Sequence, residues 1–482
     1  MPGWNFDHSY TTLPENLFSR VQVQKLSKPE LILYNASLDK ILGLGFSDLD
    51  NDSLAKIFSG QQIPANAYPI AQAYAGHQFG HFNQLGDGRA ILLGEHIAPN
   101  EKRYDIQLKG SGITPYSRRG DGQATLSAML REYLYSEAMH GLGIATTRSL
   151  AVVKTGEHVI RQEVNEGAIL TRIAASHIRV GTFEYAAHLQ GKDTLKALFD
   201  YTIQRHFPHL KDAENAALTF LNEVIQLQIE LIVEWMRVGF IHGVMNTDNM
   251  SIAGETIDYG PCAFMNAYDP ATVFSSIDTN GRYAFGNQPS IAHWNLGCLA
   301  SALLSLIDEN TDAAVEKAKE LLQKFPQQFQ EAWYQMMGRK TGLIDPDESD
   351  IYLIDELLTI IKKYKGDYTN TFCYLMNIPV PDHSIYQTEE FISWKLKWDE
   401  RLTSKNSAES RFTIMRSSNP IYIPRNYLVE EALENFTTNQ DNVLFDQMLQ
   451  RMRTPYQYDE KDRLLQEPPP HGDAHYHTFC NT

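Results

Sequence analysis

The spacing of hydrophobic residues changes twice along the chain. Between Gln84 and Arg172, five short apolar runs are separated by glycine and polar residues, which predicts strands of an antiparallel sheet. In chain order they are RAILLGE, YDIQLKG, SLAVVKT, EHVIRQE and GAILTRI. One amphipathic segment, from about Gln123 to His140, repeats leucine every four residues and predicts a single helix among them.

The rest of the chain has helical spacing. Two short helices are expected near the start, one capped by Asn35 and ended by Gly43, the other from about Asp50 to Phe58. After about Thr182, long helices are predicted at 212–238, 291–307, 311–337, 350–364 and 389–402. Between the first two of these, residues 241–264 hold two apolar pieces that flank Gly254-Glu255, which predicts a small hairpin.

These patterns predict an α+β fold of two joined lobes with additions at both ends. The expected divisions are an N-terminal extension (1–75), a lobe of sheet and helix (76–181), a mostly helical lobe (182–400) and a C-terminal helical extension with an irregular tail (401–482).

Composition narrows the class of protein. With 482 residues, 43% of them apolar, the chain is long enough to bury more than one core. Its four cysteines are too few and too scattered for a disulfide framework, which favours a reducing compartment. The polar start lacks a signal pattern and no apolar run looks long enough to span a membrane, so we expect no membrane association.

The charge is unevenly distributed. The formal net charge is −17, which argues against a nucleic-acid partner, because such proteins neutralise phosphates with a basic face. Lys102 to Arg179 nevertheless holds 11 basic and 7 acidic residues. A basic segment in an acidic protein favours a small anionic ligand.

Two features, one just before this segment and one within it, suggest phosphate binding. Gly86-Asp87-Gly88-Arg89 precedes a predicted strand, and glycines in a tight turn let backbone N–H groups approach a phosphate, although an ordinary turn has the same composition. Lys109 ends the next strand, and Glu132 on the predicted helix could pair with it and direct the ammonium group. Lys109 and Glu132 could equally be solvated surface charges.

Polar residues gather again in the second lobe. His242, Asn246, Asp248 and Asn249 lie within eight residues, and Asp258 follows a short apolar run. Carboxylate and amide oxygens are the ligands that Mg²⁺ prefers. Taken singly, the same residues are common in helix caps and turns.

The order of these features is that of a protein kinase: glycine turn, strand lysine, helix glutamate, histidine loop ending in Asn249, then Asp258-Tyr259-Gly260. One position departs from the pattern. Val244 stands where the catalytic aspartate of a kinase is expected, and valine cannot accept a proton. Asp248 is the nearest carboxylate. The chain is therefore either a catalytically silent kinase fold or an enzyme that uses another phosphate and another base.

Six long strings extend the comparison: YAGHQFGHFNQLGDGRA (74–90), DIQLKGSGITPYSRRGDGQATL (105–126), ILTRIAASHIRVGTFEYAA (169–187), HGVMNTDNMSI (242–252), TIDYGPCAF (256–264) and GRYAFGNQP (281–289). They resemble the selenoprotein O (SelO) family of protein adenylyltransferases. The resemblance implies a protein-kinase-like two-lobed fold that binds ATP in the reverse sense and transfers AMP, rather than phosphate, to Ser, Thr or Tyr hydroxyls of proteins. Because no transit or signal peptide precedes the matching strings, we expect the cytoplasm of a bacterium.

The resemblance also implies roles for individual residues. The proton acceptor would be Asp248, and the Mg²⁺ ligands, with Mn²⁺ as a substitute, would be Asn249 and Asp258. ATP contacts would come from Gly86, Gly88, Arg89, Lys109, Asp121, Gly122, Arg172, Arg179 and Asp258. Arginine suits this role because its planar fork holds a phosphate through two bonds. Arg172 and Arg179 would, without the resemblance, be taken as surface charges.

Other questions stay open at this level. The family often carries a redox residue near its C-terminus, which Cys480 matches, and a partner would have to be Cys262; an inert tail cysteine is equally compatible. Three functions compete: AMP transfer, with UMP transfer from UTP as a variant; a silent ATP-binding scaffold; and a small-molecule phosphotransferase. The expected partners are ATP and protein substrates, and the expected state is a monomer.

Overall fold

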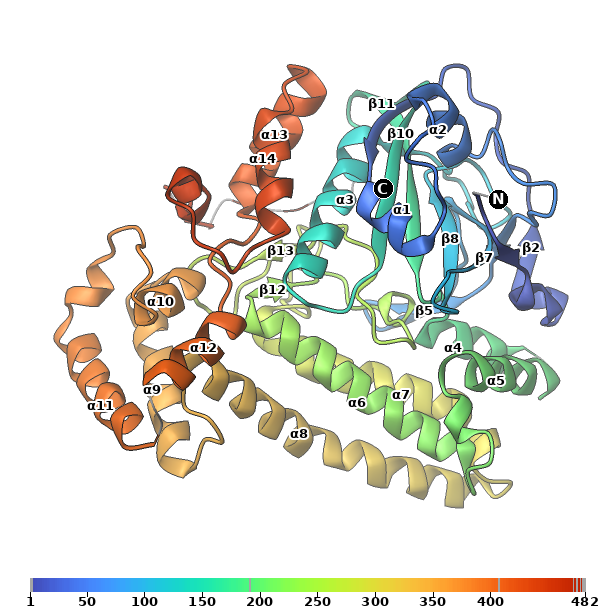
Figure 1. The fold of residues 1–482 in the computed structure, drawn as a ribbon. Helices are drawn as coiled ribbons and strands as arrows, with labels where there is room; N and C mark the ends of the chain where they lie inside the picture. Colours follow the sequence, from blue (N-terminus) through green and yellow to red (C-terminus); the bar gives the residue numbers. More distant parts are fainter. Residues whose placement is uncertain are drawn as a thin grey trace.

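The computed structural model describes residues 3–189, 192–405, 408–470, 472–473, 476 and 478. Figure 1 shows a lobe built on a twisted sheet and a second lobe of long helices beneath it. This arrangement confirms the predicted α+β, two-lobed architecture.

The small lobe is organised around an antiparallel sheet, which has nine strands among the described residues, in the order β2-β4-β7-β8-β11-β10-β3, with β1 paired to β7 and β9 to β11. Its strands are β1 (Phe6–Asp7), β2 (Phe18–Arg20), β3 (Glu30–Tyr34), β4 (Ile70–Gln72), β7 (Ala90–Ile97), β8 (Arg103–Lys109), β9 (Ala124–Thr125), β10 (Arg148–Ile160) and β11 (Val164–Ala174). The segment 1–75, expected as an extension, therefore contributes four strands to this sheet.

Two predicted strands prove to be one. SLAVVKT and EHVIRQE both fall largely on β10, which runs on through a register shift between Lys154 and His158 against β11. Gly156 lies at this irregularity with φ +78°, a conformation that glycine adopts without strain. The turn-like composition therefore marks a bulge rather than a chain reversal.

Alternating side chains cover both faces of the sheet. Ile91 and Leu93 on β7 belong to the core beneath α1 (Ala36–Leu42) and α2 (Asn51–Phe58), whereas Leu92 belongs to the core beneath α3 (Leu126–Gly141). The Asn35 side chain accepts a hydrogen bond from the Leu38 N–H at the start of α1, as predicted.

The large lobe consists of helices. They are α4 (Val180–His188), α5 (Asp193–His206), α6 (Ala216–Arg237), α7 (Gln288–Ile307), α8 (Thr311–Thr341), α9 (Glu348–Lys363), α10 (Tyr368–Leu375), α11 (Glu389–Lys405) and α12 (Ala408–Ser418). The five predicted long helices correspond to α6, α7, α8, α9 and α11. The sequence analysis did not anticipate α4 and α5.

Helix α6 and residues 285–307 are, among the described residues, long and apolar enough to cross a membrane by length and composition alone. These two windows differ from the expectation that no apolar run is long enough to span a membrane. About half of each apolar window is buried inside the protein, 56% and 50% respectively, and both helices pack against each other and against α8. Their hydrophobicity is thus accounted for by the core of the large lobe.

The hairpin predicted about Gly254-Glu255 is wrong. Ser251 instead bridges to Arg179, and Thr256 bridges to Thr146 in the small lobe. Besides the main sheet, the described residues form two two-stranded sheets: β12 (Phe240–Ile241) with β13 (Ala263–Phe264), and β5 (Ala75–Gln78) with β6 (His81–Gln84). The two apolar stretches on either side of Gly254-Glu255 therefore lie against distant segments of the chain rather than against each other.

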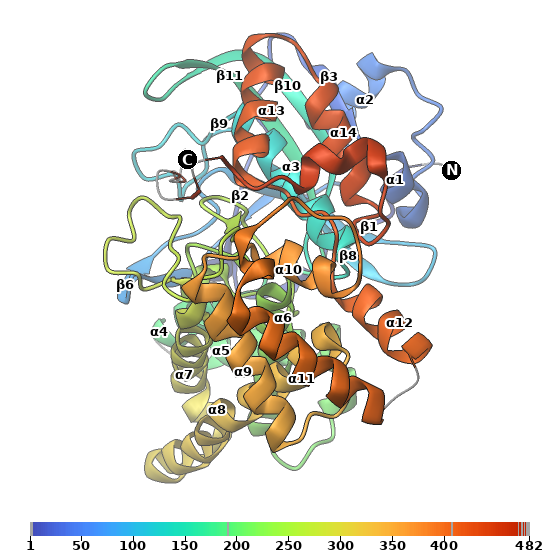
Figure 2. The same cartoon turned by 90° about the vertical axis from the view of Figure 1, so that its left-hand side faces the viewer.

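The C-terminal helices return to the small lobe. Helices α13 (Asn426–Thr438) and α14 (Val443–Met452) pack against α3 (Figure 2). The Thr478 N–H donates to the carbonyl of Phe274, so the tail lies against the large lobe. Cys480 lies outside the described residues, and its predicted redox role stays a prediction.

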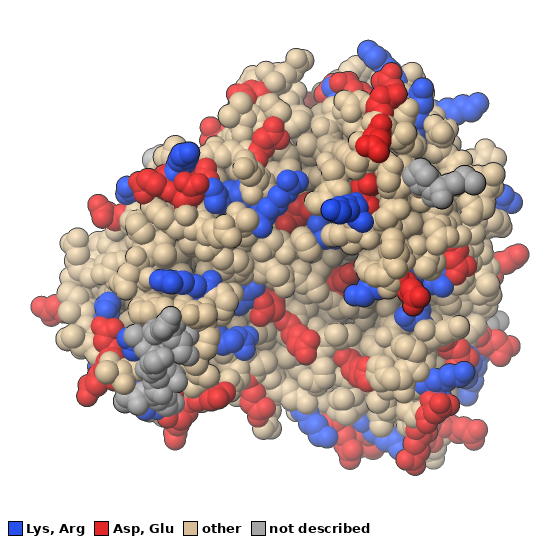
Figure 3. Space-filling view, in the orientation of Figure 1, with Lys and Arg blue, Asp and Glu red and all other residues tan. Residues whose placement is uncertain are grey.

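Acidic and basic side chains are interspersed over the face drawn in Figure 3.

Candidate active site

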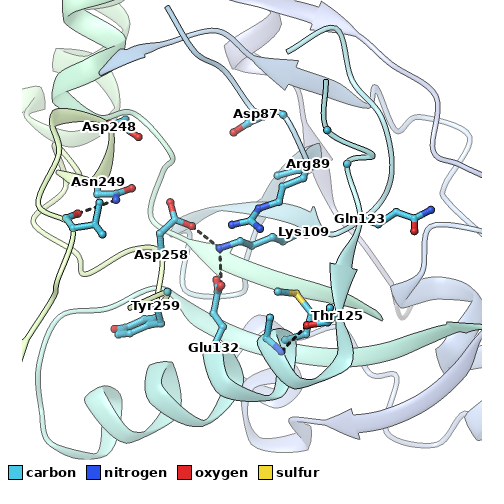
Figure 4. A pocket seen from close by; sticks show the side chains of 18 of the residues that line it. Asp87, Arg89, Lys109, Gln123, Thr125, Glu132, Asp248, Asn249, Asp258 and Tyr259 are labelled. Carbon is cyan, nitrogen blue, oxygen red and sulfur yellow. Dashed lines mark hydrogen bonds and ion pairs between the residues drawn. The ribbon is translucent and has the colours of Figure 1, made fainter. Parts of the chain in front are cut away.

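One cavity of about 850 Å³ lies between the lobes (Figure 4). This volume falls in the range of sites that hold small-molecule ligands. All the predicted site residues line it: Gly86, Gly88, Arg89, Lys109, Asp121, Gly122, Arg172, Arg179, Asp248, Asn249 and Asp258. Residues from six separate stretches of sequence thus meet at a single site. Eight of its lining residues are basic and six are acidic.

The turn before β7 forms part of the wall. Gly86 has φ +149°, and a Cβ at this position would lie 2.4 Å from the Tyr116 ring. A Cβ on Gly88 would lie 2.9 Å from the Tyr116 carbonyl oxygen. Position 86 therefore requires glycine for conformation and for space, and position 88 for space alone. Arg89 follows directly, and its Nη1 is buried without a hydrogen-bond partner among the described residues.

A buried network of charges lies at the centre of the cavity. The Lys109 ammonium donates to Glu132 Oε2 at 2.6 Å and to Asp258 Oδ1 at 2.6 Å. Arg172 Nη1 donates to the same Asp258 oxygen at 2.5 Å and to Glu132 Oε1 at 3.3 Å. Two cations and two carboxylates thus share one site, and the predicted Lys109–Glu132 pair is present in the structure.

The cations determine the ionisation of Asp258. Burial would raise the pKa of its carboxyl group, but the charges of Lys109, Arg172 and Arg179 outweigh this and hold the pKa well below its usual value. Asp258 is therefore an anion at any physiological pH. It compensates part of the positive charge that the cavity would otherwise present.

Arg179 approaches the cavity from the N-terminus of α4. Its guanidinium lies 4.1 Å from the centre of the Tyr74 ring, and its Nη2 is 3.9 Å from Asp87 Oδ1. Its Nε is buried without a hydrogen-bond partner among the described residues. Buried arginine donors that lack partners are expected to bind an anionic ligand, since leaving them unsatisfied costs free energy.

Asp248 lies in a short 3₁₀ helix, η4 (Thr247–Asn249), on the large-lobe side. Its Oδ1 is buried without a hydrogen-bond partner among the described residues. Burial, opposed by Arg179, raises the pKa of its carboxyl group to about 6. A carboxylate with such a pKa can accept a proton near neutral pH, as a general base must.

Asn249 and Asp258 are the candidate metal ligands. The Asn249 Nδ2 group donates to the Val244 carbonyl oxygen at 2.9 Å, which orients the amide so that its Oδ1 is the atom available to a cation. Asp258 keeps a quarter of its side chain exposed. An amide oxygen and a carboxylate that line one cavity fit the oxygen preference of Mg²⁺.

His242 holds the two loops of the large lobe together. Its Nε2 lies 2.9 Å from the Ile257 carbonyl oxygen, next to Asp258, and it is fully buried. Burial lowers the pKa of His242, which favours the neutral ring. His242 is therefore a structural residue, and Val244, in the place of the kinase aspartate, contributes only apolar surface to the cavity wall.

Asp121 is held by an arginine that the sequence analysis did not single out. Arg161 at the end of β10 donates to both Asp121 oxygens, at 2.7 and 3.0 Å. Gly122 has φ +67°, and a Cβ there would lie 2.1 Å from the Gly112 carbonyl oxygen. This loop, which also carries Arg118 and Arg119, forms the outer rim of the cavity.

Sequence reasoning also missed Tyr74, Asp87 and Arg131 as lining residues. Tyr74 and Asp87 lie inside the string 74–90 that carries the family resemblance, so their neighbourhood was identified but not their roles. Arg131 is one residue before Glu132, and it pairs with Glu430 on α13. No local signal could link two residues so far apart in the sequence.

Comparison with known proteins identifies the family. A family model described as "Protein adenylyltransferase SelO" matches residues 3–453 of this chain. The chain belongs to the SelO family. The protein nucleotidyltransferase YdiU of Pelagibacter ubique is 52% identical over 481 residues, covering 100% of this chain and 99% of the relative. The YdiU protein of Bacillus cereus is 50% identical with the same coverage.

Solved structures resemble this SelO-family chain only distantly. ROP2 from Toxoplasma gondii, described as a virulence factor with a protein-kinase fold and no enzymatic activity, has 12% identity and a TM-score of 0.24, with 70% of this chain and 87% of that chain covered. A rhoptry kinase from the same organism has 10% identity and a TM-score of 0.22. The two-lobed architecture is defined by the helices and strands of this chain.

Proposed function

We propose that this SelO-family protein transfers AMP from ATP to Ser, Thr or Tyr hydroxyl groups of proteins and releases pyrophosphate. The observation that carries the proposal is the convergence of Lys109, Arg172 and Arg179 on one cavity that also holds Asp248, whose buried Oδ1 has no hydrogen-bond partner among the described residues. Relatives at about 50% identity over nearly their whole length are named protein nucleotidyltransferases, which supports the same reaction class.

The side chains suggest how the reaction would proceed. Asp248 accepts the proton of the incoming hydroxyl, whose oxygen forms a bond to the α-phosphorus while the bond to the bridging oxygen breaks. The negative charge of the departing pyrophosphate develops near Lys109, Arg172 and Arg179, which are already in place to stabilise it. Glu132 keeps the ammonium of Lys109 oriented throughout.

A divalent cation belongs to this proposal. Asn249 and Asp258 would hold Mg²⁺, or Mn²⁺ in its place, and the bound ion would neutralise phosphate charge. Asp258 pairs with Lys109 and Arg172 in the structure, so its carboxylate is already directed into the centre of the cavity.

A silent ATP-binding scaffold remains the second candidate, because Val244 cannot act as a base. The two candidates differ in the fate of the nucleotide. Purified protein with a substrate protein such as casein would be incubated with α-labelled or γ-labelled ATP and Mg²⁺, and the intact mass of each protein measured. We expect label only from the α position and a mass increase equal to one AMP.

Two variants make this test specific. Asp248→Asn should lower the rate of labelling about 10²–10⁴-fold while nucleotide binding is retained, since the carboxamide cannot accept the proton. Asp258→Ala should abolish labelling at every Mg²⁺ concentration. Label from the γ position alone would show phosphorylation instead, and no label from either position with intact ATP binding would favour the scaffold. Repeating the assay with α-labelled UTP decides between AMP and UMP transfer.

The named relatives come from bacteria, which supports a bacterial origin for this activity, and we propose the cytoplasm as its location. The protein targets would be recognised outside the cavity.

A further inference from the structure

Three side chains that can bind a metal ion come together beside the active site. His77 on β5, Glu184 on α4 and Cys298 on α7 each direct one ligand atom to a common place, and these atoms all lie within 4.8 Å of one another. They come from three elements that pack together beneath the small lobe (Figure 1). Nothing in the proposed AMP transfer uses any of the three.

The buried Glu184 carboxylate is a second observation that suggests a bound cation. Its side chain is 5% exposed, and its Oε2 is buried without a hydrogen-bond partner among the described residues. Its Oε1 lies 2.5 Å from His77 Nδ1, yet the geometry at that nitrogen is not that of a hydrogen bond. A buried carboxylate oxygen left in this way is costly unless a cation or proton compensates it.

We propose that His77, Glu184 and Cys298 form a binding site for Zn²⁺. The donor set of imidazole nitrogen, carboxylate oxygen and thiolate sulfur selects zinc over magnesium, which prefers oxygen ligands alone. Three protein ligands leave one coordination position for water, and the 24% exposure of the His77 side chain gives solvent a path to it.

The ligand atoms, all within 4.8 Å of one another, must shift to surround an ion. Ligand atoms around a tetrahedral zinc lie about 3.3 Å apart, so His77 Nδ1 and Glu184 Oε1 must separate by about 0.8 Å from their 2.5 Å contact. The His77 ring is held at its edges by Phe82 and Trp294, with ring centres 5.3 and 5.2 Å away. The nearby guanidinium of Arg282, 4.9 Å from the Trp294 ring, opposes the cation with its own charge.

The site would support the loop that carries Asp248. The backbone N–H of His77 donates to Thr247 Oγ1 at 2.8 Å, and a Cβ on Gly76 would lie 2.2 Å from Asp248 Oδ1. Strand β5 is thus the surface against which Asp248 packs. A zinc ion that ties β5 to α4 and α7 fixes this strand and acts as a structural support rather than as a reactant.

The competing explanation is a simple His77–Glu184 pair beside a neutral thiol. It is physically reasonable, because burial, together with the charge of Glu184 and a hydrogen bond to its carboxylate, raises the pKa of Cys298 to about 12. The two explanations differ in whether Cys298 binds metal as a thiolate.

Cobalt provides a direct test. The full chain, freed of metal with a chelator and kept without nucleotide and Mg²⁺, would be titrated with Co²⁺, and the thiolate-to-cobalt charge-transfer absorption recorded. We expect one Co²⁺ per chain with this absorption, and its loss when Zn²⁺ is added. Cys298→Ser should remove the absorption and weaken Zn²⁺ binding at least tenfold, and Glu184→Gln should weaken binding while keeping the absorption.

Matched controls separate this site from adventitious binding. Cys373→Ser changes another buried thiol, which contacts the Pro420 carbonyl, and should keep the absorption. His209→Gln removes the exposed His209–Glu223 pair and should bind Co²⁺ as the parent chain does.

Absence of the charge-transfer absorption from the parent chain at saturating Co²⁺ would overturn the proposal, and so would its persistence in Cys298→Ser. If circular dichroism shows that Cys298→Ser does not fold, the Co²⁺ titrations of the parent chain and of Glu184→Gln still test the proposal. Hydrogen exchange gives a second measurement: Zn²⁺ should slow exchange of the amides of residues 75–78 in the parent chain only. Because no nucleotide is present, the outcome is independent of the proposed AMP transfer.

Discussion

The raised pKa of Asp248 makes a quantitative prediction about pH. Burial brings the pKa of this carboxyl group to about 6, so the base is half ionised at pH 6 and fully ionised at pH 8. At pH 5 about one molecule in eleven carries the ionised base, by the titration of a single group. The kcat/KM for protein labelling should therefore rise about tenfold from pH 5 to pH 8 and level off above pH 7.

The assay is transfer of α-label from ATP to protein at fixed Mg²⁺, measured as kcat/KM, because this ratio reports ionisations of the free enzyme. Nucleotide affinity measured over the same range with Asp248→Asn controls for titration of ATP itself. The variant should also show a flat profile at a rate about 10²–10⁴-fold below the parent, the usual contribution of a general base.

Glu255 offers a matched control for the assignment. It is a second carboxyl group with a raised pKa, about 7, caused mainly by burial, and it lies outside the cavity against the Ala175 N–H. Glu255→Gln should leave the break near pH 6 in place. If the break disappears in Glu255→Gln, or if the parent profile is flat from pH 5 to 8 while ATP binds equally, then Asp248 is not the base.

Further substitutions test the supporting structure. Glu132→Gln should lower kcat/KM about 10²-fold, because the Lys109 ammonium loses its buried partner. Glu137→Gln, on the same helix, is the control, since it breaks the buried pair with Arg148. It should lower the melting temperature and leave kcat/KM unchanged. Gly86→Ala should weaken ATP binding about tenfold in a calorimetric titration, since its Cβ would collide with the ring beneath the turn. Glu255→Gln should melt at a higher temperature than the parent at pH 8 but not at pH 4.5: its folded pKa is raised, so its stabilising contribution is lost as pH rises from about 4.5 to about 7.

Local sequence signals were sufficient where the structure is local. The caps of α1 and α2, the helix α3 and the long helices of the large lobe follow from residue spacing, because an amphipathic helix is specified by contacts three and four residues apart. The order of glycine turn, lysine, glutamate, asparagine and aspartate likewise indicated a site before any geometry was known.

Local signals failed where partners are remote. The apolar pieces at 250–258 looked like a hairpin but bridge to Arg179 and Thr146. Strands from the first 75 residues join a sheet whose other strands lie up to position 174, and no short-range pattern announces that pairing. The pairing of Arg161 with Asp121 spans 40 positions and could not be found from either residue alone.

The family, the succession of elements and the identity of the chemical groups follow from the amino-acid sequence, because they depend on residue type and spacing along the chain. Which of those groups meet depends on the folded structure. It gave Asp248 its raised pKa and Asp258 its lowered one, since a carboxyl group responds to burial and to neighbouring charges, and those are set by folding. It also assembled His77, Glu184 and Cys298 from three elements more than a hundred residues apart in sequence at each step.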